Sequence, residues 1–186
     1  MESKYLHGDF KKIIVSEEEI KGIICRIANE INENYKGKKL LMCGILKGAF
    51  IYMSDLIRQI NIPLELTFIK ASSYGSGSVS QGNVDVIEYS DLENYNNFNI
   101  LVIDDILDSG NTLCFLKDYL KNKGFENIEF CVLLDKPERR EKEIFVKYIG
   151  KKIENEFVVG YGLDYAEKYR NLPFIAALDE KVYKNT

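Results

Sequence analysis

The stretch from Asn99 to Thr112 reads Asn-Ile-Leu-Val-Ile-Asp-Asp-Ile-Leu-Asp-Ser-Gly-Asn-Thr, and it is the most informative part of the chain. Its first half contains Ile100 to Ile103, a continuous apolar run without polar alternation, which is typical of a strand buried on both faces of a parallel sheet. The second half turns polar, and apolar residues then recur at helical spacing from Leu113 to Leu120. The stretch therefore predicts a strand, a loop and a helix in that order, and hence an α/β fold.

The loop between strand and helix has the composition of a phosphate site. The free N–H groups at the start of a helix, together with its dipole, attract an anion largely without side-chain cations. Gly110 permits a close approach of the backbone, and the hydroxyl groups of Ser109 and Thr112 add hydrogen-bond donors. We therefore expect this loop, which also contains Asn111, to bind a phosphate group.

Three carboxylates, Asp104, Asp105 and Asp108, precede the loop. Carboxylates repel phosphate, so these side chains must serve another group, such as sugar hydroxyls, a metal ion or a proton. Aspartate is common at turns and helix caps, which would explain any one of the three. A preference for turns and caps is a much weaker explanation for three aspartates that all lie beside one phosphate loop.

Leu101 to Thr112 resembles the ribose-phosphate signature of type I phosphoribosyltransferases, a hydrophobic strand, two acids, two apolar residues and then Asp-Ser/Thr-Gly-x-Thr. Further matches between Leu46 and Arg170 narrow the resemblance to the hypoxanthine-guanine branch of that family, and it covers nearly the whole chain. The resemblance implies a central, mostly parallel sheet flanked by helices, in a single domain over residues 1–186. It also implies a small hood built from the N-terminal segment and the C-terminal region from about residue 136 onward.

The same resemblance implies an enzyme of purine salvage. The expected reaction transfers the 5-phosphoribosyl group of 5-phosphoribosyl diphosphate to hypoxanthine or guanine, giving IMP or GMP and diphosphate, and leaves xanthine open as a third base. By this match Asp108 is the catalytic group, a general base or hydrogen-bond acceptor for N7 of the purine. Asp104 and Asp105 bind ribose hydroxyls or magnesium-bound water, although the family often has Glu at the first position.

Other strand ends carry further matches. The loop Leu46-Lys47-Gly48 resembles the pyrophosphate loop of the family, which can contain a non-proline cis peptide before the lysine. Arg170 matches an arginine that pairs with pyrophosphate, and Asp164 matches an acid that reaches the magnesium-bound pyrophosphate. The resemblance thus implies Mg²⁺ as cofactor, with Asp104, Asp105 and Asp164 close to it, partly through water or substrate.

Lys136, Phe157 and Val158 match the purine site of the family. There the lysine donates to the 6-oxygen of the base, the aromatic ring stacks on the purine, and the backbone carbonyl at the position of Val158 meets the 2-amino group of guanine. A charged donor suits a 6-oxopurine and is mispaired with the amino group of adenine. Arg140 matches a nearby arginine, which we interpret as structural or oligomeric rather than catalytic.

The segment 71–83 is rich in Ser and Gly and does not bury enough apolar surface to order itself. From the residues alone it is equally a slack hairpin loop or a lid. Ser73 and Tyr74 match the Ser-Tyr pair of a mobile family loop that closes over the reaction centre and excludes water. The resemblance therefore favours a lid.

Periodicity places the remaining elements. Ser16 and Glu19 form a capping box at the start of an amphipathic helix that Gly37 ends, and a second helix starts at Phe50. The expected further strands are Leu40 to Ile45, Leu64 to Lys70, Val84 to Tyr89, Ile128 to Leu134, Phe145 to Ile149, Phe157 to Tyr161 and Ile175 to Leu178.

Composition narrows the class of protein. The chain has 186 residues and a net charge of -4, which does not suggest broad attraction to nucleic acid or an anionic membrane. Four scattered cysteines indicate reduced core thiols in a cytoplasmic protein, and a single histidine argues against a zinc site. No apolar run approaches the ~18 residues of a membrane span. We expect as partners the two substrates and further copies of the chain, in a homodimer or homotetramer.

Two alternatives come from other classes of protein. Val102 to Asp105 also resembles the acidic pair of a bacterial receiver domain, but that pair lies on the first strand and not in mid-chain before a phosphate loop. A purine-sensing regulator on the same fold would be expected to lose Asp108 or Lys136, or to carry a DNA-binding region. This chain keeps both residues, and we expect no extra domain within its length.

Overall fold

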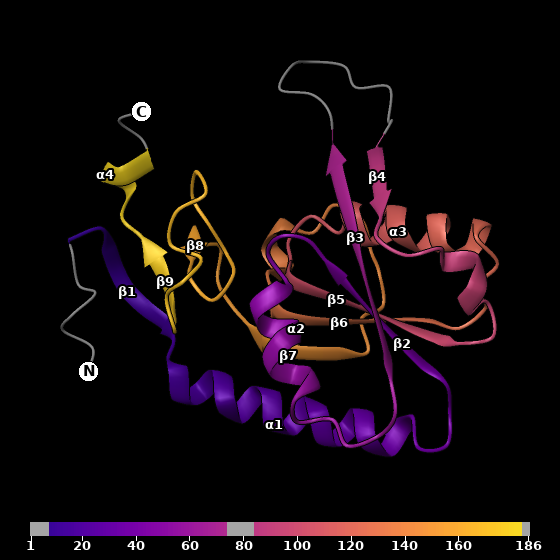
Figure 1. Ribbon diagram of the computed structural model, residues 1–186. Coiled ribbons are helices and arrows are strands. Elements are labelled where there is room, and N and C mark those ends of the chain that lie inside the picture. Colours follow the sequence, from indigo (N-terminus) through magenta and orange to yellow (C-terminus); the bar gives the residue numbers. More distant parts are fainter. Residues whose placement is uncertain (1–7, 74–83, 184–186) are drawn as a thin grey trace.

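A six-stranded sheet with helices on both faces forms the body of the protein, and a separate three-stranded sheet lies beside it (Figure 1). The computed structural model describes residues 8–73 and 84–183. All neighbouring strands of the larger sheet are parallel except the first two, which are antiparallel. In spatial order the strands are β4 (Val84–Glu88), β3 (Glu65–Ser73), β2 (Leu40–Ile45), β5 (Asn99–Leu107), β6 (Ile128–Asp135) and β7 (Tyr148–Lys152). The expected mostly parallel α/β architecture is confirmed.

The smaller sheet joins segments from both ends of the chain. Its strands, in spatial order, are β1 (Phe10–Val15), β9 (Ile175–Leu178) and β8 (Val158–Val159), and they are antiparallel. We call this sheet, together with residues 153–174, the hood. Its C-terminal part begins only after β7, because β7 pairs with β6 in the larger sheet. The expected hood boundary near residue 136 stays a prediction.

Helices cover the larger sheet on both faces. They are α1 (Glu17–Asn34) and α2 (Phe50–Ile57), which pack against each other, α3 (Asn111–Asn122), and the short α4 (Glu180–Tyr183) at the hood. The predicted capping box of α1 is present, with the Ser16 hydroxyl accepting from the Glu19 amide and the Glu19 carboxylate accepting from the Ser16 amide. Two short 3₁₀ helices lie at Leu92–Tyr95 and Pro137–Arg139.

The two faces of β5 explain its continuous apolar sequence. Leu101 and Ile103 belong to the core cluster beneath α1 and α2, whereas Ile100 and Val102 belong to the cluster beneath α3. All four side chains are fully buried. Because neither face of the strand meets water, the sequence shows no polar alternation.

Several strands differ in extent from the expectation. β5 continues through the two acids to Leu107, and β3 continues to Ser73, three residues into the segment expected to be a lid. β7 begins at Tyr148 rather than Phe145, whose side chain is 79% exposed and contributes little to the core. β1 had no expected counterpart, because its partner β9 lies at the far end of the chain.

Candidate functional site

Asp104 and Asp105 lie near the end of β5, which carries them to the carboxyl edge of the larger sheet. Asp104 is only 8% exposed, and its Oδ1 accepts a hydrogen bond from the amide of Asp105 at 3.0 Å. Burial raises the pKa of both carboxyl groups, and the charge of Asp105 raises that of Asp104 further. Both residues nevertheless line a cavity of about 280 Å³, which we call the carboxylate cavity. They are therefore placed to meet a cation or hydrogen-bond donors that enter it.

The loop after β5 lines this cavity, and its conformation depends on Gly110. Gly110 has a φ of 85°, and a Cβ there would lie 2.3 Å from the backbone oxygen of Lys142. The Ser109 carbonyl accepts hydrogen bonds from the amides of Glu141 at 2.9 Å and Lys142 at 3.0 Å. The loop conformation thus requires glycine and is braced from outside by the segment after β6.

The amide groups at the start of α3 indicate an anion site. Asn111 N donates to the hydroxyl of Ser109 at 3.3 Å. Within the residues that the structure describes, the amides of Ser109, Gly110 and Thr112 have no hydrogen-bond partner. All three residues line the carboxylate cavity, so their N–H groups are available to an anion bound there.

Gly48 is enclosed between the acidic strand and the hood. A Cβ at Gly48 would lie 1.8 Å from Oδ2 of Asp105, and a Cβ at Gly162 would lie 2.1 Å from the backbone oxygen of Gly48. The peptide bond between Leu46 and Lys47 is cis, as the resemblance allowed. The loop after β2 therefore touches both the carboxylate cavity and the hood.

Lys47 and Arg170 share a carboxylate that the sequence analysis did not single out. Oε2 of Glu167 lies 3.0 Å from Nζ of Lys47 and 3.4 Å from the guanidinium of Arg170. The bond to Lys47 lowers the pKa of Glu167. Arg170 also pairs with Asp164 at 2.8 Å and donates to the backbone oxygen of Gly162. We call Lys47, Asp164, Glu167 and Arg170 the cation cluster.

Nothing in the sequence distinguishes Glu167 from other exposed acids. Its role becomes visible only in the turn 166–169, where Glu167 has a φ of 65° and its amide donates to Asp164 at 2.8 Å. The turn brings its carboxylate to Lys47, which is 120 positions away in the chain.

A second cavity of about 450 Å³ contains the expected purine residues Lys136, Phe157 and Val158. We call it the aromatic cavity. Lys136 is 7% exposed, and burial lowers the pKa of its amine while the charge of Asp108 opposes that shift. Among the described residues no acid lies within ion-pair distance of the Lys136 ammonium, which leaves it free to donate to a ligand.

Tyr183 of α4 adds an aromatic ring that the sequence analysis missed. Phe157 is 41% exposed, and its ring stacks on Tyr183 with centroids 5.1 Å apart and planes 27° apart. Tyr165 meets Phe157 edge-on at 5.8 Å. Tyr183 lines the aromatic cavity as well. The four residues of α4 are too few for a periodic signal, so no pattern pointed to it.

Asp108 lines both the carboxylate cavity and the aromatic cavity. Its Oδ1 lies 3.1 Å from Nε of Arg139, a residue to which the sequence analysis gave no role. Arg140 acts differently, since its guanidinium is buried against Asp135 and its Nε donates to the backbone oxygen of Asp108 at 3.2 Å. Arg139 thus pairs with the carboxylate of Asp108, whereas Arg140 donates a hydrogen bond to the backbone of Asp108.

The expected lid lies mostly beyond the described residues. Ser73 is the last residue of β3 and pairs with Val84 of β4. Tyr74 and the rest of the segment to residue 83 fall outside the described part of the chain. The lid therefore stays a prediction.

Within the described ranges, no three His, Cys, Asp or Glu side chains gather into a metal site. A metal ion near Asp104 and Asp105 would need oxygen ligands from water or a substrate as well. The same residues include no helix with the length and apolar character needed to cross a bilayer.

Known proteins match this chain in both sequence and structure. The family described as the phosphoribosyl transferase domain matches residues 12–166. The hypoxanthine-guanine phosphoribosyltransferase of Staphylococcus aureus (strain MW2) is 44% identical over 181 residues, which are 97% of this chain and 100% of the relative.

Among solved structures, a crystal structure of a hypoxanthine phosphoribosyltransferase from Staphylococcus aureus has a TM-score of 0.90 at 43% identity, covering 98% of this chain and 99% of that one. The hypoxanthine phosphoribosyl transferase of Trypanosoma cruzi has a TM-score of 0.88 at 34% identity, with 96% of each chain covered. The likeness therefore extends over the larger sheet and the hood together.

Proposed function

The chain belongs to the phosphoribosyltransferase family, and from this membership we infer that it is an enzyme of purine salvage. It transfers the 5-phosphoribosyl group of 5-phosphoribosyl diphosphate to hypoxanthine or guanine, giving IMP or GMP and diphosphate. The observation that carries the mechanism is the position of Asp108, which lines the carboxylate cavity and the aromatic cavity at once.

We propose that the carboxylate cavity holds the ribose 5-phosphate. The amides of Ser109, Gly110 and Thr112, with Asn111 at the start of α3, would bind the phosphate, since the three residues line the cavity and the helix dipole favours an anion. Asp104 and Asp105 would accept hydrogen bonds from the ribose hydroxyls. Anchoring both ends of the sugar fixes its reacting carbon against the base.

The cation cluster is the proposed site of the diphosphate. Lys47 and Arg170 supply positive charge, and Gly48 allows the backbone to approach, because its missing side chain leaves room beside Asp105. Glu167 now occupies the space between the two cations. A diphosphate would replace one carboxylate with several phosphate oxygens at the same cations.

Mg²⁺ fits the donor set of this site. The ion prefers oxygen ligands and keeps several waters, which suits two adjacent carboxylates. Burial raises the pKa of both carboxyl groups, and the charge of Asp105 raises that of Asp104 further. We propose that Asp104 and Asp105 hold it partly through water and Asp164 partly through substrate. When bound, the ion neutralises charge on the leaving diphosphate.

The aromatic cavity is the proposed site of the purine. Phe157 would stack on the base, the Lys136 ammonium would donate to its 6-oxygen, and the carbonyl of Val158 would accept from a 2-amino group. A buried, charged donor without an acid partner favours an oxo group over the amino group of adenine.

Asp108 would take up the proton of N7 or hold it by a hydrogen bond while the new glycosidic bond forms. Its carboxylate lies on the loop between the two cavities, so it can face the base while its backbone belongs to the phosphate loop. Nε of Arg139 lies 3.1 Å from Oδ1 of that carboxylate and can orient it. Closure of a lid over residues 71–83, with Ser73 and Tyr74, would exclude water from the cationic sugar.

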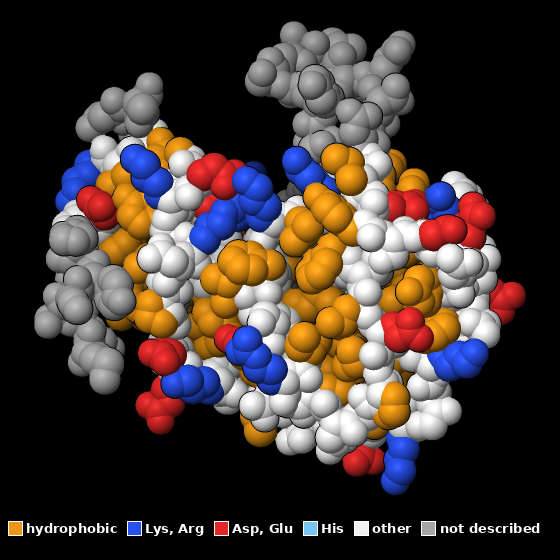
Figure 2. Space-filling model, viewed as in Figure 1, with side chains coloured by type: hydrophobic (Ala, Val, Ile, Leu, Met, Phe, Trp, Pro, Cys, Tyr) orange, Lys and Arg blue, Asp and Glu red, His pale blue; other side chains and the backbone are white. Residues whose placement is uncertain are grey.

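We further propose that the enzyme acts in the cytoplasm as a homodimer or homotetramer. The four cysteines are free, which supports a reducing compartment. Phe50 of α2, Leu66 of β3 and Ile87 of β4 are each more than 40% exposed. Figure 2 shows hydrophobic side chains gathered over α2 and β3, and burial of such a face against another copy would stabilise an oligomer.

The decisive experiment incubates the protein with 5-phosphoribosyl diphosphate, Mg²⁺ and each of hypoxanthine, guanine, xanthine and adenine, and follows nucleotide and diphosphate by chromatography. We expect IMP and GMP to form rapidly and AMP hardly at all. The rate with xanthine, compared with the rates for hypoxanthine and guanine, shows whether xanthine is a third substrate. Binding of a nucleotide without turnover of any base would instead identify a purine-sensing protein.

A further inference from the structure

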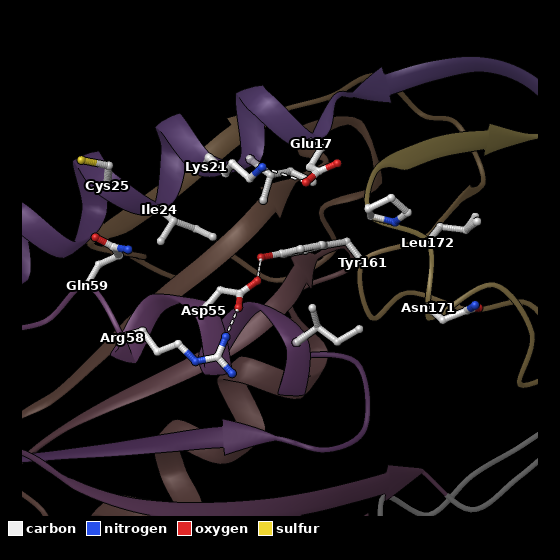
Figure 3. A pocket seen from close by; sticks show the side chains of 13 residues that line it. Glu17, Lys21, Ile24, Cys25, Asp55, Arg58, Gln59, Tyr161, Asn171 and Leu172 are labelled. Atoms are coloured by element: carbon white, nitrogen blue, oxygen red, sulfur yellow. Dashed lines mark hydrogen bonds and ion pairs between the residues drawn. The ribbon is translucent and has the colours of Figure 1, made fainter. Parts of the chain in front are cut away.

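The hydroxyl of Tyr161 ties the hood to α2. It donates to Oδ2 of Asp55 at 2.6 Å, and Oδ1 of Asp55 lies 2.8 Å from the guanidinium of Arg58 (Figure 3). Tyr161 follows β8 in the hood, whereas Asp55 belongs to α2 and Arg58 ends that helix. The contact therefore joins two segments that are 106 positions apart in the chain.

The backbone of Tyr161 is in a region that bulky residues rarely adopt. Its φ is 52°, and the flanking Gly160 and Gly162 have φ values of 102° and 104°. Such a conformation costs free energy and persists only where surrounding contacts hold it. The amide of Tyr161 donates to Leu172 at 2.9 Å, and its hydroxyl donates to Asp55, so the residue is held at both ends.

Gly162, the next residue, touches both halves of the proposed diphosphate site. A Cβ on it would lie 2.1 Å from the backbone oxygen of Gly48. Its amide donates to the Arg170 carbonyl at 2.9 Å, and its carbonyl accepts from the Arg170 guanidinium at 2.8 Å. Any displacement of Tyr161 would therefore move Gly162 relative to Gly48 and Arg170.

Asp55, the partner of Tyr161, is connected to the proposed diphosphate site through α2. That helix begins at Phe50, two residues after Gly48, and Asp55 lies within it. A bond between Tyr161 and Asp55 consequently sets the distance between the loop after β2 and the turn that carries Arg170. Two contacts thus join the hood to this part of the chain, the backbone contact of Gly48 with Gly162 and the hydrogen bond from Tyr161 to Asp55.

A cavity of about 560 Å³ lies beside this bond, between α1, α2 and the hood (Figure 3). Both Tyr161 and Asp55 line it, together with apolar side chains such as Ile24 and Leu172. The ring of Tyr161 thus borders open space on this side. Elsewhere the ring packs in the core cluster beneath α1 and α2, and the hydrogen bond to Asp55 fixes its hydroxyl end.

We propose that Tyr161 is a positioning residue for the diphosphate end of 5-phosphoribosyl diphosphate. Through Asp55 it keeps the Lys47-Gly48 loop and Arg170 at the separation that one diphosphate spans. This role rests on the proposed function of the cation cluster. Neither Tyr161 nor Asp55 touches the reacting atoms, so the effect is on substrate binding rather than on the chemical step.

The test compares Tyr161→Phe with the wild-type enzyme. We expect the KM for 5-phosphoribosyl diphosphate and the Kd for diphosphate, measured by calorimetry, to rise about tenfold, as for loss of one hydrogen bond to a charged group. The KM for hypoxanthine at saturating 5-phosphoribosyl diphosphate should change less than about twofold, because the aromatic cavity is not altered. Asp55→Ala should reproduce this pattern, and the double variant should be no worse than either single one.

Two further variants separate positioning from general stability. Asp55→Asn keeps an oxygen that accepts from Tyr161 but loses the ion pair with Arg58, so its KM should stay close to wild type. Tyr148→Phe removes another hydroxyl that joins distant elements, because Tyr148 accepts from Asn34 of α1 at 3.0 Å. It should lower the melting temperature without changing either constant.

An unchanged diphosphate Kd in Tyr161→Phe would overturn the proposal. So would a rise in the KM for hypoxanthine equal to the rise in the KM for 5-phosphoribosyl diphosphate, or a diphosphate Kd in Tyr148→Phe that rises as much as in Tyr161→Phe. The calorimetric Kd reports on Tyr161 even without turnover. If the wild-type protein formed no nucleotide, that result would count against the proposed activity but not against the role of Tyr161.

Discussion

Oδ2 of Asp105 occupies the space where a side chain on residue 48 would lie, since a Cβ on Gly48 would be 1.8 Å from that oxygen. The loop after β2 and the acids of β5 therefore fit together only with glycine at this position. Gly48→Ala should lower kcat/KM for 5-phosphoribosyl diphosphate at least about tenfold, because it displaces both groups from the substrate. Gly22→Ala is the control, since nothing lies within 4 Å of a Cβ on Gly22 of α1. Steady-state kinetics that leave Gly48→Ala within twofold of wild type would contradict this fit.

Asp108→Asn tests the group shared by the two cavities. The amide keeps the shape of the side chain but loses the proton acceptor, so we expect kcat to fall about 10²- to 10⁴-fold. The Kd for 5-phosphoribosyl diphosphate should change only a few-fold, because Asp108 contributes its backbone to the phosphate loop. Asp118→Asn on the exposed side of α3 removes the same charge away from the site and should be active. Unchanged turnover of Asp108→Asn would remove Asp108 from the catalytic role.

Glu167→Gln tests competition for the two cations. The carboxylate lies 3.0 Å from Lys47 and 3.4 Å from Arg170, so its removal should strengthen diphosphate binding, by about fivefold at low salt and less at high salt. Calorimetry at two salt concentrations measures both effects. Glu30→Gln, which breaks an exposed pair with Arg26 on α1, should change neither. Weaker diphosphate binding in Glu167→Gln would show instead that Glu167 orders the two cations for the ligand.

Lys136→Met tests the choice of base. Methionine keeps much of the length of the side chain but cannot donate to the 6-oxygen, so we expect kcat/KM for hypoxanthine and guanine to fall about 10- to 100-fold. Any reaction with adenine should fall much less, which would reduce the expected preference for 6-oxopurines. Competition assays with paired bases measure this ratio directly. A preference equal to that of the wild type would place the discrimination elsewhere in the aromatic cavity.

The capping box of α1 predicts a pH-dependent contribution to stability. Hydrogen bonds from Lys151 and from Ser16 lower the pKa of Glu19 from 4.5 to about 2. Its stabilising effect is therefore complete above the unfolded value and is lost as the pH falls from about 4.5 to about 2. Glu19→Gln should melt below the wild type at pH 7 and at the same temperature near pH 2, as circular dichroism would show. A difference that persists at pH 2 would mean that the cap does not depend on charge.

The elements predicted best from the sequence are those whose burial follows a regular pattern. β2 and β9 have the expected bounds, because short continuous apolar runs mark buried strands. The residues from Asp104 to Thr112 were predictable as a group because they are contiguous in the chain. Their arrangement around one cavity follows from a single strand, loop and helix.

Three residues beside the site could not be predicted from the sequence. Glu167, Arg139 and Tyr183 have ordinary surface neighbours in the sequence, and each contacts a residue that is distant from it in the chain. β1 was missed for the same reason, because its mixed burial pattern makes sense only beside β9. Local patterns report burial and turns, whereas these contacts join distant parts of the chain.

The pairing of Phe10 with Leu178 has a consequence for synthesis on the ribosome. β1 is made before the strands of the larger sheet, which are complete by Lys152, and its partner β9 is made after them. A growing chain can therefore assemble the acids and the phosphate loop while the wall of the aromatic cavity is still missing. During translation the protein should gain the capacity to hold a sugar phosphate before it can tell one base from another.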